Sequence, residues 1–114
     1  MKPDIFCQIV AGDIPTEWLY DDKEVLAFAD INPQAPVHIL IIPKKHFATL
    51  NDLGEIDKGL LGHMMLVAQR LATEHGIASG GYRLIINCGA HGGQVVPHLH
   101  LHLLGGRELA GDMC

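Results

Sequence analysis

The chain has 114 residues, of which 48% are hydrophobic and 18% are charged, and its formal net charge is −5 at pH 7. The high hydrophobic fraction and the low charged fraction exclude a disordered protein. The length is that of one globular domain, so we expect a single domain spanning residues 1–114. The acidic balance argues against a general nucleic-acid-binding surface. A small anionic ligand is still compatible with it, because such a ligand needs only a local positive site.

The N-terminal segment MKPDIFCQIVAGDIP lacks the uninterrupted apolar stretch of a signal peptide. No apolar run in the chain approaches the ~18 residues that a membrane span requires. Cys7, Cys88 and Cys114 are odd in number and far apart, which is not the pattern of a disulfide framework. We therefore expect a cytoplasmic protein that binds neither nucleic acid nor membranes.

The first half of the chain predicts a short helix followed by three strands. PDIFCQIVAG (3–12) reads as the helix, with Pro3 in its first turn and Gly12 as its stop. EWLY and EVLAFAD flank a polar DDK and predict a hairpin. INPQAP is a loop because two prolines in four residues exclude regular pairing, and VHILII (37–42) reads as an interior strand that is covered on both faces.

The second half predicts one long helix and two further strands. DLGE (52–55) resembles a capping box, and apolar residues then recur at helical spacing from Ile56 to Leu71 until Gly76 ends the run. YRLIIN predicts a fourth strand, CGAHGGQ a glycine-rich loop and VPHLHLHLLGG a fifth strand. The expected fold class is α+β, with a five-stranded, mainly antiparallel sheet and one long and one short helix.

Three histidines alternate with leucines in the last predicted strand. Successive side chains of a strand point to opposite faces, so His98, His100 and His102 line one face at intervals of ~6.6 Å, and the leucines turn toward the core. Three imidazoles in strict alternation beside a glycine-rich loop favour a chemical role over a packing role.

Two kinds of chemistry suit such a row. Imidazoles bind zinc, but no carboxylate stands next to the row in sequence, and a TIM-barrel metallohydrolase needs ~250 residues. Imidazole is also a nucleophile for phosphoryl or nucleotidyl transfer, and this use requires a phosphate-binding element nearby. Gly89, Gly92 and Gly93 allow backbone N–H groups to turn toward an anion, and Gln94 adds a side-chain amide.

The segment GGQVVPHLHLHLLGG resembles the signature of the histidine triad (HIT) family, H-φ-H-φ-H-φ-φ, where φ is apolar. The likeness extends in order over residues 4–107, through DIFCQIVAGDIP, LAFADINPQAPVHILIIPKKH, LLGHMMLVAQRLA and GYRLIINCGAHGGQ. The ending LLGGR is similar to the Hint branch of nucleotide-binding proteins. This resemblance implies a single HIT domain, a homodimer whose sheets join edge to edge, and an enzyme that cleaves purine nucleoside 5′-phosphoramidates through a nucleotidyl-histidine.

The resemblance also implies roles for individual residues. His100 matches the nucleophile, His102 a phosphate contact, His98 the first triad position behind them, and His46 of PKKH a neighbour of His98. The matching nucleotide-binding positions are Asp30 for the ribose hydroxyls, Phe6, Ile9, Phe28 and Ile31 for the base, and Asn87, Gly93, Gln94, Val95 and Leu101. Without the resemblance, Phe6, Ile9 and Phe28 would be read as core alone, and Asp30 could equally be a cap of the turn that follows it.

The sequence departs from the family pattern at two functional positions. Val95 stands where many relatives have a serine that reaches the leaving group. Some relatives hold a structural zinc with a C-x-x-C motif and two histidines, but here the corresponding set is Asp4, Cys7, His46 and His98. The implied chemistry requires no metal or other cofactor, so we expect none for catalysis.

Two alternative functions stay open from sequence alone. One is hydrolysis of dinucleoside polyphosphates, which other branches of the family perform. The other is a nucleotide-binding regulatory dimer with little catalysis, which the loss of the serine hydroxyl at Val95 favours.

Overall fold

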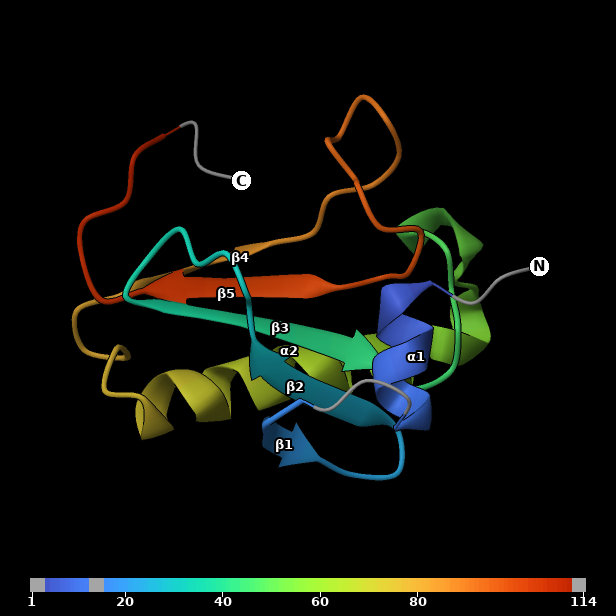
Figure 1. The fold of residues 1–114 in the computed structure, drawn as a ribbon, viewed down its shortest axis with the longest axis horizontal. Coiled ribbons are helices and arrows are strands. Elements are labelled where there is room, and N and C mark those ends of the chain that lie inside the picture. Colours follow the sequence, from blue (N-terminus) through green and yellow to red (C-terminus); the bar gives the residue numbers. More distant parts are fainter. Residues whose placement is uncertain (1–3, 13–15, 112–114) are drawn as a thin grey trace.

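The computed structural model describes residues 4–12 and 16–111. It contains α1 (Ile5–Ala11), β1 (Trp18–Asp21), β2 (Val25–Ala29), β3 (Val37–Pro43), α2 (Lys58–Glu74), β4 (Tyr82–Ile85) and β5 (Leu101–Gly105), as Figure 1 shows. The Asp4 side chain caps the start of α1 by accepting a hydrogen bond from the Cys7 amide, and Gly12 ends the helix with a positive φ of 82°. Pro3, which we predicted in the first turn, lies outside the described residues.

The five strands form one sheet in the order β1-β2-β3-β5-β4, and every neighbouring pair is antiparallel. The predicted α+β class and five-stranded sheet are therefore confirmed. β5 lies between β3 and β4, with His102 opposite Leu40 on one side and Ile85 on the other. His102 is thus placed in the interior of the sheet and not at its edge.

The two helices cover opposite faces of the sheet. Met64 and Leu71 of α2 pack against Ile41 of β3, while Phe6 of α1 packs against Leu40 of the same strand. Alternate side chains of one strand therefore enter two separate apolar clusters, which explains why residues 37–42 form an almost continuous apolar run. Because α1 has only seven residues, it covers a small part of its face, near β2 and β3 in Figure 1.

The long helix begins later than predicted. Two short 3-10 helices, Leu50–Asp52 and Glu55–Asp57, precede it, and the Asp57 carboxylate accepts a hydrogen bond from the Gly54 amide at 2.9 Å. The predicted capping box at 52–55 is therefore wrong. Ile56, assigned to the buried stripe, is 94% exposed because it precedes the first turn of α2.

The fifth strand is shorter than predicted. The His98 amide donates to the carbonyl of Val96, and the Leu99 amide donates to the carbonyl of Phe47, so the backbone leaves the ladder before Leu101. The alternation nevertheless persists, since Leu99 and Leu101 are buried in the cluster beneath α2. His98 and His100 are buried as well, and they contact Phe6 on the opposite face.

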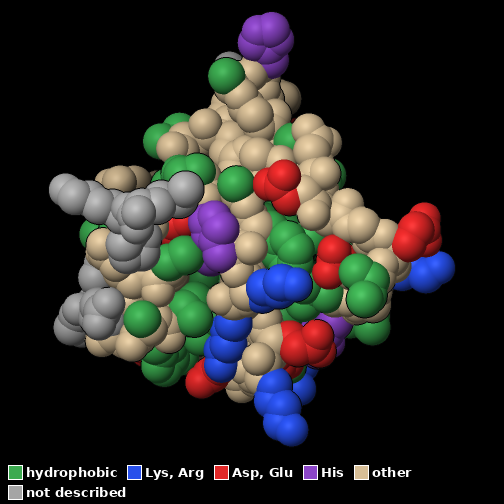
Figure 2. Space-filling view, turned by 90° about the vertical axis from the view of Figure 1, so that its right-hand side faces the viewer, with side chains coloured by type: hydrophobic (Ala, Val, Ile, Leu, Met, Phe, Trp, Pro, Cys, Tyr) green, Lys and Arg blue, Asp and Glu red, His purple; other side chains and the backbone are tan. Residues whose placement is uncertain are grey.

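On the face shown in Figure 2, basic and acidic side chains lie next to one another and do not gather into a patch of one sign. Lys44 forms an ion pair with Asp21, and Lys58 lies 3.5 Å from Glu55. Within residues 4–12 and 16–111, no helix has the length and apolar character to cross a membrane.

Candidate active site

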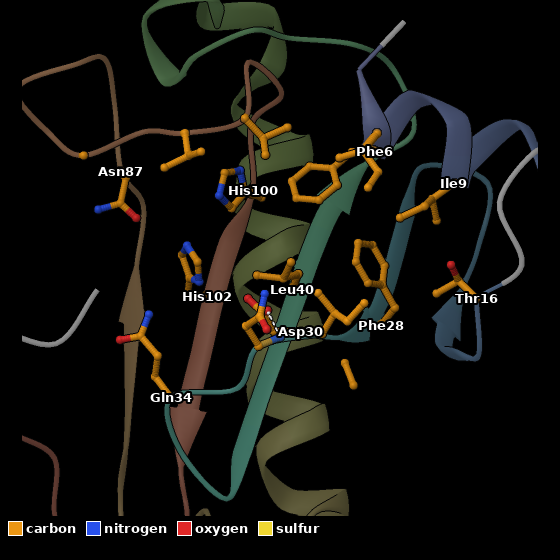
Figure 3. A pocket seen from close by; sticks show the side chains of 17 residues that line it. Phe6, Ile9, Thr16, Phe28, Asp30, Gln34, Leu40, Asn87, His100 and His102 are labelled. Atoms are coloured by element: carbon orange, nitrogen blue, oxygen red, sulfur yellow. Dashed lines mark hydrogen bonds between the residues drawn. The ribbon is translucent and has the colours of Figure 1, made fainter.

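A cavity of about 790 Å³ opens on the face of the sheet that α1 partly covers. In Figure 3, His100 and His102 lie between Asn87 on one side and the apolar residues of α1 and β2 on the other. The cavity brings together most of the predicted nucleotide-binding residues. It is lined by Ile5, Phe6, Ile9, Thr16, Phe28, Ala29, Asp30, Ile31, Asn32, Gln34, Leu40, Asn87, Gly93, Val95, Val96, His100 and His102.

His100 is held in one tautomer by the backbone. Its Nδ1 atom lies 2.7 Å from the carbonyl oxygen of His98. A carbonyl can only accept a hydrogen bond, so Nδ1 carries the proton and Nε2 of the neutral ring has a free lone pair. The ring also meets Phe6 and His102 edge to face, with centroids 5.0 and 4.9 Å away. The backbone therefore fixes the tautomer of the neutral ring, and His100 lines the cavity.

His102 is oriented by a histidine to which sequence analysis assigned no role. The Gln34 amide donates to Nδ1 of His38 at 3.1 Å, which leaves the proton of neutral His38 on Nε2. That Nε2 lies 2.9 Å from Nδ1 of His102, so His102 accepts there and carries its own proton on Nε2. His38 is the one polar residue in the apolar run VHILII, which could have marked it as a candidate site residue. Its proximity to His102 could not be foreseen, because it depends on the pairing of β3 with β5.

Burial keeps this pair of histidines uncharged. The pKa of His102 is lowered to about 4, chiefly by burial and also by nearby His100 and His38, while Asp30 opposes the effect. Burial also lowers the pKa of His38, against the opposing influence of Asp30. Both rings are therefore neutral near pH 7, and the direction of each hydrogen bond follows from the Gln34 amide.

Asp30 closes a turn and also lines the cavity. Its Oδ1 accepts the Asn32 amide at 2.8 Å and so closes the turn after β2. Its Oδ2 lies 3.4 Å from Nε2 of His38, and the side chain is 18% exposed at the cavity. Each carboxylate oxygen can accept more than one hydrogen bond, so the carboxylate can still accept from a ligand hydroxyl at the cavity.

The apolar end of the cavity is built by α1 and β2. Phe6 and Phe28 meet edge to face with centroids 5.7 Å apart, and both also belong to the buried cluster that includes Ile9. Ile31 lies at the rim and is 91% exposed. Phe6, Ile9 and Phe28 thus both line the cavity and pack in the core, and sequence analysis missed Leu40 and Thr16, which also line this region.

The glycine-rich loop differs from the predicted phosphate cradle. The Gly92 and Gln94 amides donate to the carbonyl of Gly89, and the Gly93 amide donates to that of Ala90. In this structure these amides donate within the loop, and their binding of an anion stays a prediction. Short i+3 and i+5 bonds close the loop on itself, although Gly93 still lines the cavity.

Gln94 supports the loop instead of facing the ligand. Its Oε1 accepts the Gly89 amide at 2.9 Å, and its Nε2 donates to the carbonyls of Ala48 and Val96 at 2.6 and 3.0 Å. These three bonds use the amide that we had assigned to phosphate. Gln94 is absent from the cavity lining within the described residues.

Of the remaining predicted site residues, Asn87 and Val95 line the cavity, whereas Leu101 and His46 do not. Asn87 lines the cavity and donates to the Gly92 carbonyl at 2.8 Å, and Val95 lines it with 90% of its surface exposed. Leu101 is 2% exposed beneath α2, so its side chain lies on the wrong face of the sheet to contact a nucleotide there. His46 lies outside the cavity beside His98, with the two Nδ1 atoms 3.3 Å apart, as expected.

Comparisons with known proteins agree on one family. A protein of Escherichia coli strain K12 named Purine nucleoside phosphoramidase is 51% identical over 105 residues, which are 92% of this chain and 88% of that protein. A HIT family hydrolase from Legionella pneumophila has a solved structure with a TM-score of 0.92 and 50% identity, covering 95% of this chain and 96% of that one. A histidine triad protein from Clostridium difficile also has a TM-score of 0.92, with 43% identity over 99% of this chain and 100% of its own. The family model described as the HIT domain matches residues 11–109, and the chain belongs to that family.

Proposed function

We propose that this protein is a hydrolase that cleaves purine nucleoside 5′-phosphoramidates to the nucleoside monophosphate and an amine. The observation that carries the proposal is the 2.7 Å contact from His100 Nδ1 to the His98 carbonyl, which leaves Nε2 as a free nucleophile in the cavity. The half-identical Escherichia coli relative bears the name of this activity, which supports the choice of the phosphorus–nitrogen bond.

The reaction proceeds through two displacements at phosphorus. His100 Nε2 attacks the α-phosphorus, a bond forms between them, and the bond from phosphorus to the amine breaks. The imidazolium formed keeps its Nδ1 proton, and the His98 carbonyl stabilises that positive charge. Water then attacks the same phosphorus and releases one proton to solvent, the histidine–phosphorus bond breaks, and the monophosphate leaves, which regenerates neutral His100.

His102 stabilises the negative charge of the transferring group. Its proton is on Nε2 because His38 occupies Nδ1, so it donates to a phosphate oxygen without itself being ionised. The leaving amine takes its proton from water at the cavity mouth, because the hydrocarbon side chain of Val95 has none to give.

The nucleoside fits the other half of the cavity. The Asp30 carboxylate accepts from the ribose hydroxyls, and the base packs between Phe6, Phe28 and Ile31. We further propose a cytoplasmic homodimer that joins two sheets through β4, the strand at the open edge beyond β5. Light scattering on the purified chain tests the dimer.

Replacement of the nucleophile tests the proposed function. His100→Ala should lower kcat for an adenosine phosphoramidate by 10⁴-fold or more, in the order-of-magnitude range of other lost nucleophiles. AMP should still bind, because the base and ribose contacts remain. His91→Ala, at an exposed loop histidine, is the matched control and should keep wild-type activity. Normal turnover by His100→Ala would refute the proposal.

Val95 favours a second candidate, a nucleotide-binding regulatory dimer with little catalysis. Its exposed side chain offers no hydroxyl to the leaving group. Tight binding of purine monophosphates together with negligible turnover of every phosphoramidate tested would support this candidate. Faster cleavage of diadenosine polyphosphates than of phosphoramidates would instead indicate a dinucleoside polyphosphate hydrolase.

A further inference from the structure

The segment that follows β5 lies against the β2–β3 loop, residues 30–36. Val37 at the start of β3 pairs with Gly105 at the end of β5, so the chain leaves β5 next to this loop, at one end of the sheet in Figure 1. Gly106 has a φ of 98°, and a Cβ atom at this position would lie only 2.9 Å from Cβ of Pro36. A side chain at position 106 would therefore collide with the loop, and glycine permits the close approach.

Arg107 binds the same loop from its outer side. Its Nη2 atom donates to the carbonyl of Gln34 at 2.8 Å, and its Nη1 atom donates to the carbonyl of Glu108 at 2.9 Å. The guanidinium is charged at every pH of interest, so both hydrogen bonds are charge-assisted. The second bond orients the side chain toward Gln34, although Arg107 is exposed.

The inner side of the loop is bound by active-site side chains. The Gln34 amide donates to Nδ1 of His38 at 3.1 Å, and the Asn32 amide donates to Oδ1 of Asp30 at 2.8 Å. Gln34 is therefore held at both of its backbone groups, by His38 at the amide and by Arg107 at the carbonyl. Because these two groups flank one Cα atom, a fixed carbonyl restricts the rotation that would carry the amide away from His38.

The position of the Gln34 amide decides the direction of the hydrogen bond between His38 and His102. A neutral pair has two arrangements, in which either His38 Nε2 or His102 Nδ1 is the donor. Only the first leaves a proton on Nε2 of His102, from which it can donate to an anion. The Gln34 amide selects it by occupying Nδ1 of His38, and Oδ2 of Asp30, 3.4 Å from His38 Nε2, favours it as well.

We infer that Arg107 is a positioning residue: by holding the Gln34 carbonyl it keeps the Gln34 amide on His38 and thereby keeps the proton of His102 on Nε2. Gly106 contributes by letting the segment come close enough for the contact. The tautomer assignment concerns the protein alone. Its effect on turnover rests on the proposed function, in which His102 donates to the transferring phosphate, and there a loosely held loop leaves some molecules with a lone pair facing that phosphate.

Nitrogen-15 NMR of the histidine rings at pH 7.5 tests the inference without substrate, because it distinguishes protonated from unprotonated ring nitrogens. In wild-type protein, Nδ1 of both His38 and His102 should be unprotonated. Arg107→Met keeps a long unbranched side chain but removes the donors, so it should shift both Nδ1 signals toward the protonated form. Arg107→Lys should restore them, since an ammonium can also donate to a single carbonyl.

Two controls separate the Gln34 contact from a general loss of structure. Arg70→Ala removes another exposed arginine, which donates to Glu74 on α2, and it should leave the ring signals unchanged. Gly106→Ala should shift them as Arg107→Met does, whereas Gly111→Ala, where a Cβ atom meets nothing within 4 Å, should not. Circular dichroism of each variant verifies the fold.

Steady-state kinetics with an adenosine phosphoramidate measures the consequence for turnover. Arg107→Met should lower kcat by about 3–10-fold, the range expected for the loss of one hydrogen bond, with little change in KM, and Arg107→Lys should recover the rate. Unchanged ring signals in Arg107→Met would overturn the inference, and so would an equal shift in Arg70→Ala. A shifted tautomer with unchanged kcat would remove its role in turnover. Absence of turnover in wild-type protein would refute the proposed function and leave the NMR result to decide the tautomer.

Discussion

The Nδ1 atom of His100 and the carbonyl oxygen of His98 are 2.7 Å apart. The acceptor belongs to the backbone two residues earlier, in the segment that leads into β5. The tautomer of the nucleophile is therefore set by backbone geometry, with no other side chain needed. His102 is different, because its tautomer depends on the side chain of His38 and, through it, on the amide of Gln34. The two reactive rings are thus sensitive to different substitutions.

His38 should act on catalysis through His102. His38→Phe keeps much of the buried volume but removes the donor to His102, so His102 no longer has a fixed tautomer. We expect kcat to fall about 10–100-fold with little change in KM, because the lost interaction strengthens in the transition state. His38→Gln, whose amide can donate to Nδ1 of His102, should recover part of the rate. Equal losses in both variants would argue against the tautomer role, and steady-state kinetics on each measures it.

The buried histidines should make the folded state less stable in mild acid. The pKa of His102 is about 4 in the folded protein and near 6.5 when unfolded, chiefly because burial disfavours the charged ring. Between these values the unfolded chain binds a proton that the folded chain does not, so the free energy of unfolding falls as pH drops from 6.5 to 4. Above pH 6.5 the effect vanishes. Urea unfolding across this range should show the slope, and His102→Phe should reduce it; an unchanged slope would contradict the assignment.

Gln94 should contribute more to the stability of the folded protein than to nucleotide binding. Gln94→Met removes three hydrogen bonds of a half-buried amide, to Gly89, Ala48 and Val96, while it keeps the length of the side chain. We expect the free energy of unfolding to decrease by roughly 1–3 kcal/mol in the absence of ligand. Thermal unfolding without nucleotide measures this. A variant that is as stable as wild type but binds AMP poorly would restore Gln94 as a phosphate contact.

Val95 should limit the range of leaving groups. Val95→Ser places a hydroxyl at the cavity mouth, where it can relay a proton to the departing amine. Turnover of alkylamine phosphoramidates should rise about tenfold, a small part of the range for general acid catalysis. Substrates whose leaving group needs no proton, such as nitrophenyl esters, serve as the control and should be unaffected. A uniform change on both substrate classes would assign the effect to binding.

The elements that could be predicted from the sequence are those with a single clear hydrophobic pattern. Residues 37–42 could be read as an interior strand because both faces of an inner strand are apolar, and the leucine–histidine alternation revealed which face each residue takes. The start of α2 could not be read, because Thr49, Asp52, Gly54 and Asp57 offer overlapping capping signals and the backbone uses two 3-10 helices before the α-helix begins.

The site was predictable as a set of residues but not as a set of contacts. His100, His102 and Asp30 reach the cavity as the family resemblance implied, whereas Leu101 faces the other side of the sheet and Gln94 bonds within its own loop. The role of His38 depends on the pairing of β3 with β5 and on the amide of Gln34, neither of which a linear pattern displays. The alternation of apolar and polar residues along a strand predicts which face of the sheet a side chain takes. Its hydrogen-bond partners depend on how distant segments pair in the folded chain.

Rapid acid quenching with a substrate labelled in the α-phosphate measures the central step most directly. During turnover, wild-type protein should carry acid-labile label on one histidine, and peptide mapping should place it on His100. His100→Gly should carry none, while His98→Asn, which keeps the backbone carbonyl, should still be labelled. Label on another residue, or rapid turnover with no labelled protein at any quench time, would contradict a covalent intermediate at the central histidine.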